Sequence, residues 1–226
     1  MKKLCFPAMM ALLILSLAGC GGEFVVFLGT PIGLEILSDP ALDGDITMDL
    51  GTGNIGPPTV AATTGNVLAG IDINPGTGVP VAESRGFLIF SMEAIPSHAY
   101  IQFASIRVFL NDVSFVTSST APIPFLLDSI DTILNPPPIV SDDFNSSFRR
   151  SRSLSFFGRD AGNFVEINVT SLLADAQARG LSHFEVRAVF DQDRFLSDPT
   201  TTQGLITIDD RTTNSSRAPM LYVEYF

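Results

Sequence analysis

Lysine is almost absent from the sequence: among its 226 residues, only Lys2 and Lys3 are lysines. A Walker-type phosphate loop, a Schiff-base enzyme and pyridoxal chemistry each require a lysine, so the chain beyond residue 3 excludes all three. The 24 Asp and Glu residues therefore outnumber the 13 Lys and Arg residues, which gives a formal net charge of −11. Because such a surface repels polyanions, we expect no nucleic-acid partner.

Histidine, cysteine and tryptophan are equally scarce. The histidines are His98, in a Pro-Ser-His turn, and His183, at the start of a predicted strand. No Gly-x-Ser-x-Gly motif accompanies them, so a histidine-based hydrolase is not favoured. Two histidines without a free cysteine are also too few ligands for a zinc site. The chain has no tryptophan, which weakens the case for sugar binding on aromatic platforms.

The longest apolar run lies at the amino terminus, where Leu4–Ala18 follows Met1-Lys2-Lys3. A charged start and a short apolar stretch are typical of a secretory signal peptide, and a membrane span would need ~20 apolar residues. Leu17-Ala18-Gly19-Cys20 closes the run and resembles the bacterial lipobox. The resemblance implies that residues 1–19 are removed and that Cys20 is acylated on its sulfur and on its new amino group. An ordinary signal peptide is the alternative.

Acylation of Cys20 would also set the location of the protein. The three acyl chains on Cys20 would exceed the two signals that stable membrane anchoring requires. Gly21 and Gly22 follow, and in Gram-negative lipoproteins the absence of Asp at the second mature position implies the outer membrane. We therefore expect a signal peptide (1–19), a lipidated anchor and tether (20–30) and one domain (31–226), which has no disulfide and depends on its core.

Most of the remaining chain is typical of strands separated by turns. Residues 31–80 are rich in Gly, Pro, Thr and Asp with brief apolar runs, which predicts short strands, although disorder is an alternative for Gly51–Thr64. Gly86–Met92 is almost continuously apolar, and this predicts a strand that is buried on both faces.

The longest strand signal runs from Tyr100 to Phe115. The parity of its apolar residues switches near Phe103-Ala104, which predicts a β-bulge or break at that point. Beyond the switch, Ala104, Ile106, Val108 and Leu110 are expected to face one side of the sheet. Arg107 and Phe109 are expected to face the other side.

One helix is expected, at about residues 171–179. Thr170 or Ser171 could cap its start, and Gly180 is placed to end it in the left-handed conformation. Because the helix is only two to three turns long, it must pack on a sheet to be stable.

Three segments carry a family resemblance: Arg85–Leu88 with the alternation from Ile101 to Val108, Val165–Thr170 before the helix, and Arg217–Tyr225 at the end. Together they resemble the DNRLRE-type domain, a jelly-roll β-sandwich related to carbohydrate-binding modules. The resemblance implies an all-β jelly roll over about residues 60–226, with the helix as a crossover, and a carbohydrate-like ligand. The family's name-giving motif and its tryptophan-containing segment do not occur.

Calcium is the metal that the sequence favours, because it takes hard oxygen ligands and jelly-roll modules often hold it in loops that contain aspartate. The candidate ligands form three groups: Asp43, Asp45 and Asp49; Asp191 and Asp193; and Asp209 and Asp210. No group matches an EF-hand loop, and no other cofactor is expected.

Two further sets of charged residues have a functional and a plainer interpretation. Glu93, Glu166 and Glu185 could supply the carboxylate pair of a glycosidase, but with 24 acidic groups a solvated surface is the simpler interpretation. Arg149, Arg150 and Arg152 could bind an acidic polysaccharide or a lipid A phosphate, or could form a solvated loop.

The sequence therefore favours a non-catalytic, membrane-anchored β-sandwich of the cell envelope that binds or displays a ligand. Carbohydrate is suggested by the resemblance alone. The alternatives are a structural or assembly component of an envelope protein complex and, with less support, an envelope glycosidase.

Overall fold

The computed structural model describes residues 29–51, 53–60, 65–74, 76–115, 120–130, 138–210 and 216–226. The expected signal peptide (1–19), Cys20 and most of the tether lie outside these ranges, so the expectation of a lipid anchor stays a prediction. Pro31–Phe226 forms one compact unit.

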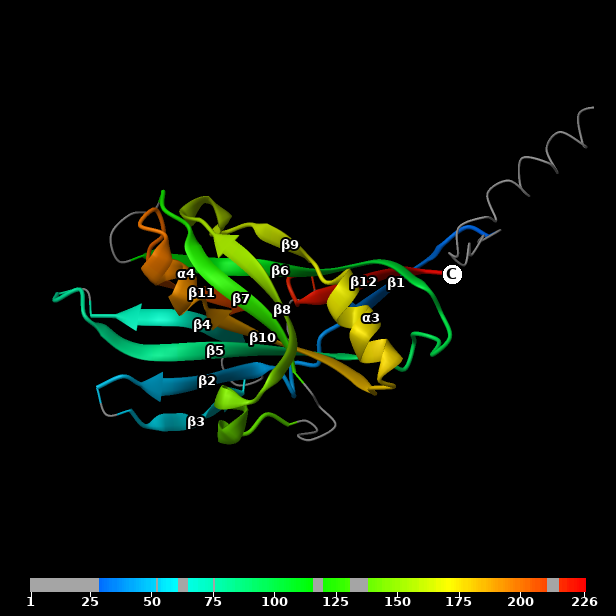
Figure 1. The fold of residues 1–226 in the computed structure, drawn as a ribbon, viewed down its shortest axis with the longest axis horizontal. Helices are drawn as coiled ribbons and strands as arrows, with labels where there is room; N and C mark the ends of the chain where they lie inside the picture. The colour runs from blue at the N-terminus through cyan, green and yellow to red at the C-terminus, as the bar shows by residue number, and fades with distance from the viewer. Residues whose placement is uncertain are drawn as a thin grey trace, which may run out of the picture. The chain divides into compact units, whose positions relative to one another are not determined.

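The unit consists mainly of strands, with few and short helices in the described ranges (Figure 1). In chain order the elements are β1 (Ile32–Leu37), β2 (Gly44–Asp49), β3 (Ile55–Val60), β4 (Asn66–Ile73), β5 (Pro80–Ser91), β6 (Ile101–Phe115), β7 (Ile123–Ile130), η1 (Ser141–Asn145), β8 (Phe148–Phe156), η2 (Gly158–Asp160), β9 (Phe164–Asn168), α3 (Thr170–Ala178), β10 (His183–Phe190), α4 (Gln192–Ser197), β11 (Gly204–Asp209) and β12 (Met220–Tyr225).

The strands form one curled antiparallel sheet in the order β1-β12-β6-β11-β4-β5-β10-β7-β8. Strand β9 adds to β6, and β2 adds to β5 and carries β3. Strand β6 belongs to both layers, because its residues up to Phe109 pair with β12 and β9 while those from Leu110 pair with β11. The prediction of an all-β fold is confirmed, and the curled sheet is consistent with a jelly-roll sandwich.

The predicted bulge in β6 is present. Ile101 pairs with Tyr225 and Phe103 pairs with Glu224, so that Gln102 is the additional residue. The extra residue reverses the parity, and beyond it Ala104 and the alternate residues that follow enter the core.

Strand β5 is buried on both faces, as its continuous apolar run predicts. Leu88 and Phe90 belong to the main core between the layers. Phe87 and Ile89 point the other way into a second, smaller apolar cluster, where Phe144 of η1 covers them. A segment from the middle of the chain therefore closes the outer side of this layer.

Helix α3 covers the core with Leu172, Leu173 and Ala176, as expected. Gly180 has a φ of 70° and ends the helix region as expected. The expected N-cap is wrong: the N-cap residue is Val169, which makes no side-chain cap hydrogen bond, and Asn168 Oδ1 accepts from Thr170 N at 3.1 Å. The hydroxyl of Thr170 instead contacts the backbone of β6, where it accepts from Ala104 N at 2.9 Å.

Candidate functional site

Four neighbouring strands, β1, β12, β6 and β9, form one layer of the sandwich. Side chains alternate along a strand, so the residues next to the buried Ala104, Ile106 and Val108 point away from the core. We call this outward side the four-strand face. These four strands are far apart in the sequence, and strand pairing brings their side chains together.

The strand register places the residues of the four-strand face in rows. The central row is Glu35, Tyr222, Ser105 and Asn168; the row on one side contains Gly33, Glu224 and Phe103, and the row on the other contains Leu37, Met220, Arg107 and Glu166. Aromatic rings, carboxylates and a guanidinium group therefore share one side of one sheet.

Tyr222 occupies the middle of the four-strand face. Its ring lies against that of Phe103, with the ring centroids 6.4 Å apart and the planes tilted by 56°. Its hydroxyl donates to Glu224 Oε1 at 2.7 Å, and this hydrogen bond raises the pKa of Tyr222. Gly33 lies beside the ring, where a Cβ atom would be 3.1 Å from the Tyr222 hydroxyl oxygen. The glycine thus leaves room for the tyrosine.

Arg107 and Phe164 form the second centre of the four-strand face. The Arg107 guanidinium lies 5.0 Å above the centre of the Phe164 ring, which is 47% exposed. Phe164 meets Phe109 edge-on with ring centroids 5.1 Å apart. Beside them, the Ser105 hydroxyl donates to Glu166 Oε1 at 2.7 Å. Exposed rings can stack on an apolar ligand surface, while carboxylates accept hydrogen bonds from hydroxyl groups and Arg107 donates them.

The three candidate glutamates lie in different surroundings. Glu166 is exposed on the four-strand face, whereas Glu185 is 3% exposed on the outer side of the opposite layer. Glu93 follows β5 and lines an open hollow of about 350 Å³. Burial raises the pKa of Glu185 to about 8, and the charge of Asp143 raises it further. Glu93 is not among the groups that shift the pKa of Glu185. Glu166 and Glu185 therefore cannot flank one glycosidic bond.

Three of the calcium candidates accept hydrogen bonds from the backbone. Asp191 caps α4, accepting a hydrogen bond from Arg194 N at 3.0 Å, and Asp193 is exposed on that helix. Asp49 accepts from Gly51 N at 2.7 Å in an exposed turn. Asp45 is buried and accepts from Leu68 N at 3.2 Å. The calcium hypothesis for these residues stays a prediction.

Asp43 and Asp210, from two different candidate groups, come together. Both side chains are fully buried. Burial raises the pKa of Asp210 to about 7, and burial together with the charge of Asp210 raises that of Asp43. The Ser38 hydroxyl lies close to both carboxyl groups and favours their ionised forms. Asp209, the neighbour of Asp210 in its candidate group, pairs with Arg217. The distance from Arg217 Nη1 to Asp209 Oδ2 is 3.7 Å.

The three candidate arginines lie on the exposed strand β8 rather than in a loop. Arg150 pairs with Asp175 of α3 at 3.1 Å, so its charge is partly neutralised. The histidines also lie at the surface: His98 is exposed, and His183 Nδ1 is 3.0 Å from the hydroxyl oxygen of its neighbour Ser182.

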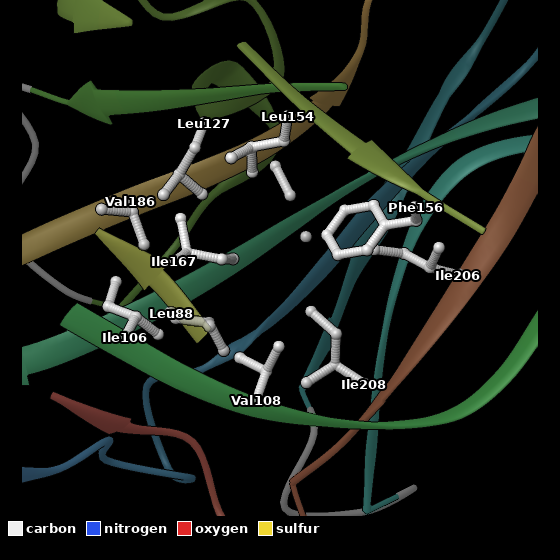
Figure 2. Close-up of a pocket in the computed structure, with 12 residues that line it drawn as sticks. Leu88, Ile106, Val108, Leu127, Leu154, Phe156, Ile167, Val186, Ile206 and Ile208 are labelled. Atoms are coloured by element: carbon white, nitrogen blue, oxygen red, sulfur yellow. The ribbon is translucent and has the colours of Figure 1, made fainter. Parts of the chain in front are cut away.

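The space between the two layers is not a ligand site. Figure 2 shows apolar side chains from both layers pointing towards one another around a cavity of about 20 Å³. Its lining includes Leu88, Ile106, Phe156 and Ile208. Ligand pockets usually measure ~300–1,000 Å³, so this void is a small packing defect. An apolar void of this kind stays dry.

Within the described ranges, no three Asp, Glu, His or Cys side chains gather closely enough to hold a metal ion. In the same part of the chain, no helix has the length and apolar character needed to cross a bilayer. No protein-family model matches the chain, and no curated protein matches it. The resemblance to the DNRLRE-type domain therefore stays a prediction.

Proposed function

We propose that the protein is a lipid-anchored envelope protein whose β-sandwich is a non-catalytic binding module for a carbohydrate-like ligand. The observation that supports it best is the four-strand face, where Tyr222, Phe103 and Phe164 share one side of the sheet with carboxylates and Arg107. A polyhydroxylated ligand offers apolar ring faces and hydroxyl groups, and these side chains complement both.

A glycan array with the purified full chain in detergent tests this proposal. We expect specific binding that falls at least about tenfold in Tyr222→Ala and in Arg107→Ala, because each change removes a direct contact. Arg152→Ala and Glu93→Gln are the matched controls, since both residues are exposed and lie away from the four-strand face. Binding that survives both face variants would contradict the proposed site, and an array with no binding would contradict the carbohydrate ligand.

A structural role in an envelope complex is the second candidate, and the edge strand β1 supports it. Among the described strands β1 pairs only with β12, and its Ile32 and Leu37 side chains are 56% and 50% exposed. An edge that is open and partly apolar can pair with another chain. Photo-crosslinking from position 37 in intact cells would then yield one defined envelope protein, while the array stays blank.

A further inference from the structure

The antiparallel sheet ends at four of the described strands, since β1, β3, β8 and β9 each pair with only one other described strand. The free side of such a strand presents backbone N–H and C=O groups to which another strand can bind. Proteins protect these edges with prolines, with charged side chains or by keeping the strand very short. The four edges can therefore be compared by the protection that each one carries.

Three of the edges are protected. Strand β3 contains Pro57 and Pro58, whose nitrogen atoms carry no hydrogen to donate. Strand β8 has three arginines within Phe148–Arg152. Strand β9 is only five residues long and has Glu166 at its centre. Proline, charge and length thus disfavour the addition of a further strand at these three edges.

The edge of β1 lacks this protection. Its six residues include no proline, and they pair with β12 without a bulge. Glu35 is the only charged residue of the strand. Ile32 and Leu37 are both more exposed than any of the other apolar residues of β1. An unprotected and partly apolar edge of this kind favours pairing with another strand.

We propose that β1 pairs in antiparallel fashion with β1 of a second copy of this chain. Two identical edges related by a two-fold axis cover each other, so the assembly closes at two copies. Pairing of β1 with a different edge of the next copy would leave one β1 open at the end of a growing filament. That arrangement would also have to use one of the three protected edges. A second copy that presents its own β1 is therefore the partner that the edges favour.

The side-chain pattern of β1 restricts the register of this pairing. Leu34 and Ile36 pack against the main core, whereas the residues that alternate with them lie on the four-strand face. Facing residues of paired strands point to the same side of the sheet, so a symmetric pair must place one residue of β1 opposite its own copy. Centring the pair on Leu34 covers residues 32–36, and centring it on Glu35 covers residues 33–37. Any other centre pairs fewer residues of the strand.

Charge selects between these two registers. Centring on Glu35 places two carboxylates directly opposite each other, which is destabilising. Centring on Leu34 places Glu35 opposite Gly33 of the second copy, and Ile32 opposite Ile36 of the second copy. Ile32, which is 56% exposed, then gains an apolar neighbour. The two-fold axis therefore passes beside Leu34.

This pairing joins the four-strand faces of the two copies into one continuous surface, because a two-fold axis perpendicular to the sheet keeps both faces on the same side. For a ligand that binds the four-strand face, the dimer presents two copies of the site side by side. The dimer goes beyond the proposed function and does not depend on a carbohydrate ligand. It gives β1 a second copy as its partner, whereas the envelope-complex function gives it a different protein.

Disulfide trapping in membranes of cells that produce the full chain tests the register. Residues directly opposite each other in an antiparallel pair have Cα atoms ~4.5–5.5 Å apart, which is within the range of a disulfide. We expect Leu34→Cys to give at least about tenfold more disulfide-linked dimer than Glu35→Cys, the matched control. In the Leu34 register the two copies of position 35 are displaced along the strands and lie more than ~7 Å apart. The unchanged chain gives the background from its own cysteines, Cys5 and Cys20.

Sedimentation of the purified full chain in detergent tests the dimer without a disulfide. We expect a concentration-dependent dimer whose dissociation constant rises at least about tenfold in Ile32→Lys, because lysine adds a charge to the edge and removes the apolar contact. Leu196→Lys is the matched control, since Leu196 is 72% exposed on α4, and it should dimerise like the wild type. Unfolding midpoints of the dilute, monomeric variants should equal that of the wild type and so show that both variants fold.

The opposite results overturn the proposal. A chain that stays monomeric at every concentration, without dimer from Leu34→Cys, would show that β1 does not pair with itself. More dimer from Glu35→Cys than from Leu34→Cys would contradict the register. Equal dissociation constants for Ile32→Lys and the wild type would place the interface elsewhere.

The identity of the trapped product separates the two functions of the β1 edge. A disulfide between position 34 and a different protein would support the envelope-complex function and contradict the dimer. Sugar binding plays no part in these measurements, so a glycan array without binding would contradict the carbohydrate ligand and leave the dimer standing.

Discussion

Arg187 Nη2 donates a hydrogen bond to Asp128 Oδ2 at 2.9 Å, and both side chains are at most 4% exposed. Arg187 Nη1 also donates to the backbone carbonyls of Asp143 and Phe144, at 3.0 Å each. Burial lowers the pKa of Arg187, while its hydrogen bond to Asp128 acts against that shift. One buried arginine thus joins β10, β7 and η1.

Removing one partner of this ion pair should destabilise the fold strongly. We expect Asp128→Ala to lower the free energy of unfolding by about 3–5 kcal/mol, because the charge of Arg187 then stays buried without a counterion. Urea unfolding measures the loss. The double variant Asp128→Leu with Arg187→Met should lose much less than the single one. A single-variant loss below about 1 kcal/mol would mean that the pair does not hold these elements together.

Glu185 should make stability fall as the pH rises. Its pKa is about 8 in the fold against an ordinary 4.5, so the folded state holds a proton that the unfolded state releases. The contribution of the bound proton to the free energy of unfolding is complete below about pH 4.5 and is lost progressively up to about pH 8. Arg187 favours the charged form and Asp143 opposes it, but burial has the largest effect.

Glu185→Gln isolates this contribution, because glutamine is uncharged at every pH. We expect the variant to match the wild type near pH 4 and to be more stable by several degrees in its unfolding midpoint near pH 9. The exposed Glu166→Gln serves as the control and should follow the wild type throughout. Parallel curves for the wild type and Glu185→Gln would exclude a raised pKa.

Gly204 should tolerate no side chain. A Cβ atom there would lie 2.2 Å from the Ser114 carbonyl oxygen and 2.5 Å from Ile123 Cδ1. We expect Gly204→Ala to cost about 3 kcal/mol or more, at the upper end of overpacking, because a backbone atom must move. Gly78→Ala is the control: it has a φ of 69° and open space, so it should cost only about 1–2 kcal/mol. Equal losses would contradict the close approach of β11 to β6.

Thr170 should act as an anchor to β6 rather than as a helix cap. Its hydroxyl contacts both the N–H and the carbonyl of Ala104, which is fully buried. Thr170→Val keeps the shape and removes both hydrogen bonds, so we expect a loss of about 1–3 kcal/mol in chemical unfolding. Ser171→Ala should have almost no effect, since Ser171 is exposed. A larger loss for Ser171→Ala would restore the capping interpretation.

Local patterns were sufficient to predict much of the fold. The parity switch predicted a bulge near Phe103-Ala104, and the extra residue is the adjacent Gln102. The apolar run Gly86–Met92 predicted a strand that is buried on both faces. The short helix was expected at 171–179 and is found at Thr170–Ala178. These features depend on residues within a few positions of each other. Helix α4 was missed because its six residues lack a helical apolar pattern and depend on Asp191 as a cap.

The site residues were harder to predict because strand pairing brings them together. Arg107 and Phe109 were expected to face away from the core, but nothing in the sequence aligned them with Tyr222 and Glu35. Asp43 and Asp210 were likewise candidates in separate groups. Ser38 was not a candidate, because a serine after a strand carries no signal of its own. Their contact depends on the path of the chain through both layers.

The amino terminus decides the central claim, because an envelope binding module needs its lipid anchor. Mass spectrometry of the native protein, cut by a protease that cleaves after glutamate, would release the short peptide from Cys20 to Glu23. We predict that residues 1–19 are absent and that Cys20 carries a diacylglyceryl group on its sulfur and an acyl chain on its nitrogen. An unmodified Cys20, or a peptide that still contains residues 1–19, would contradict the account.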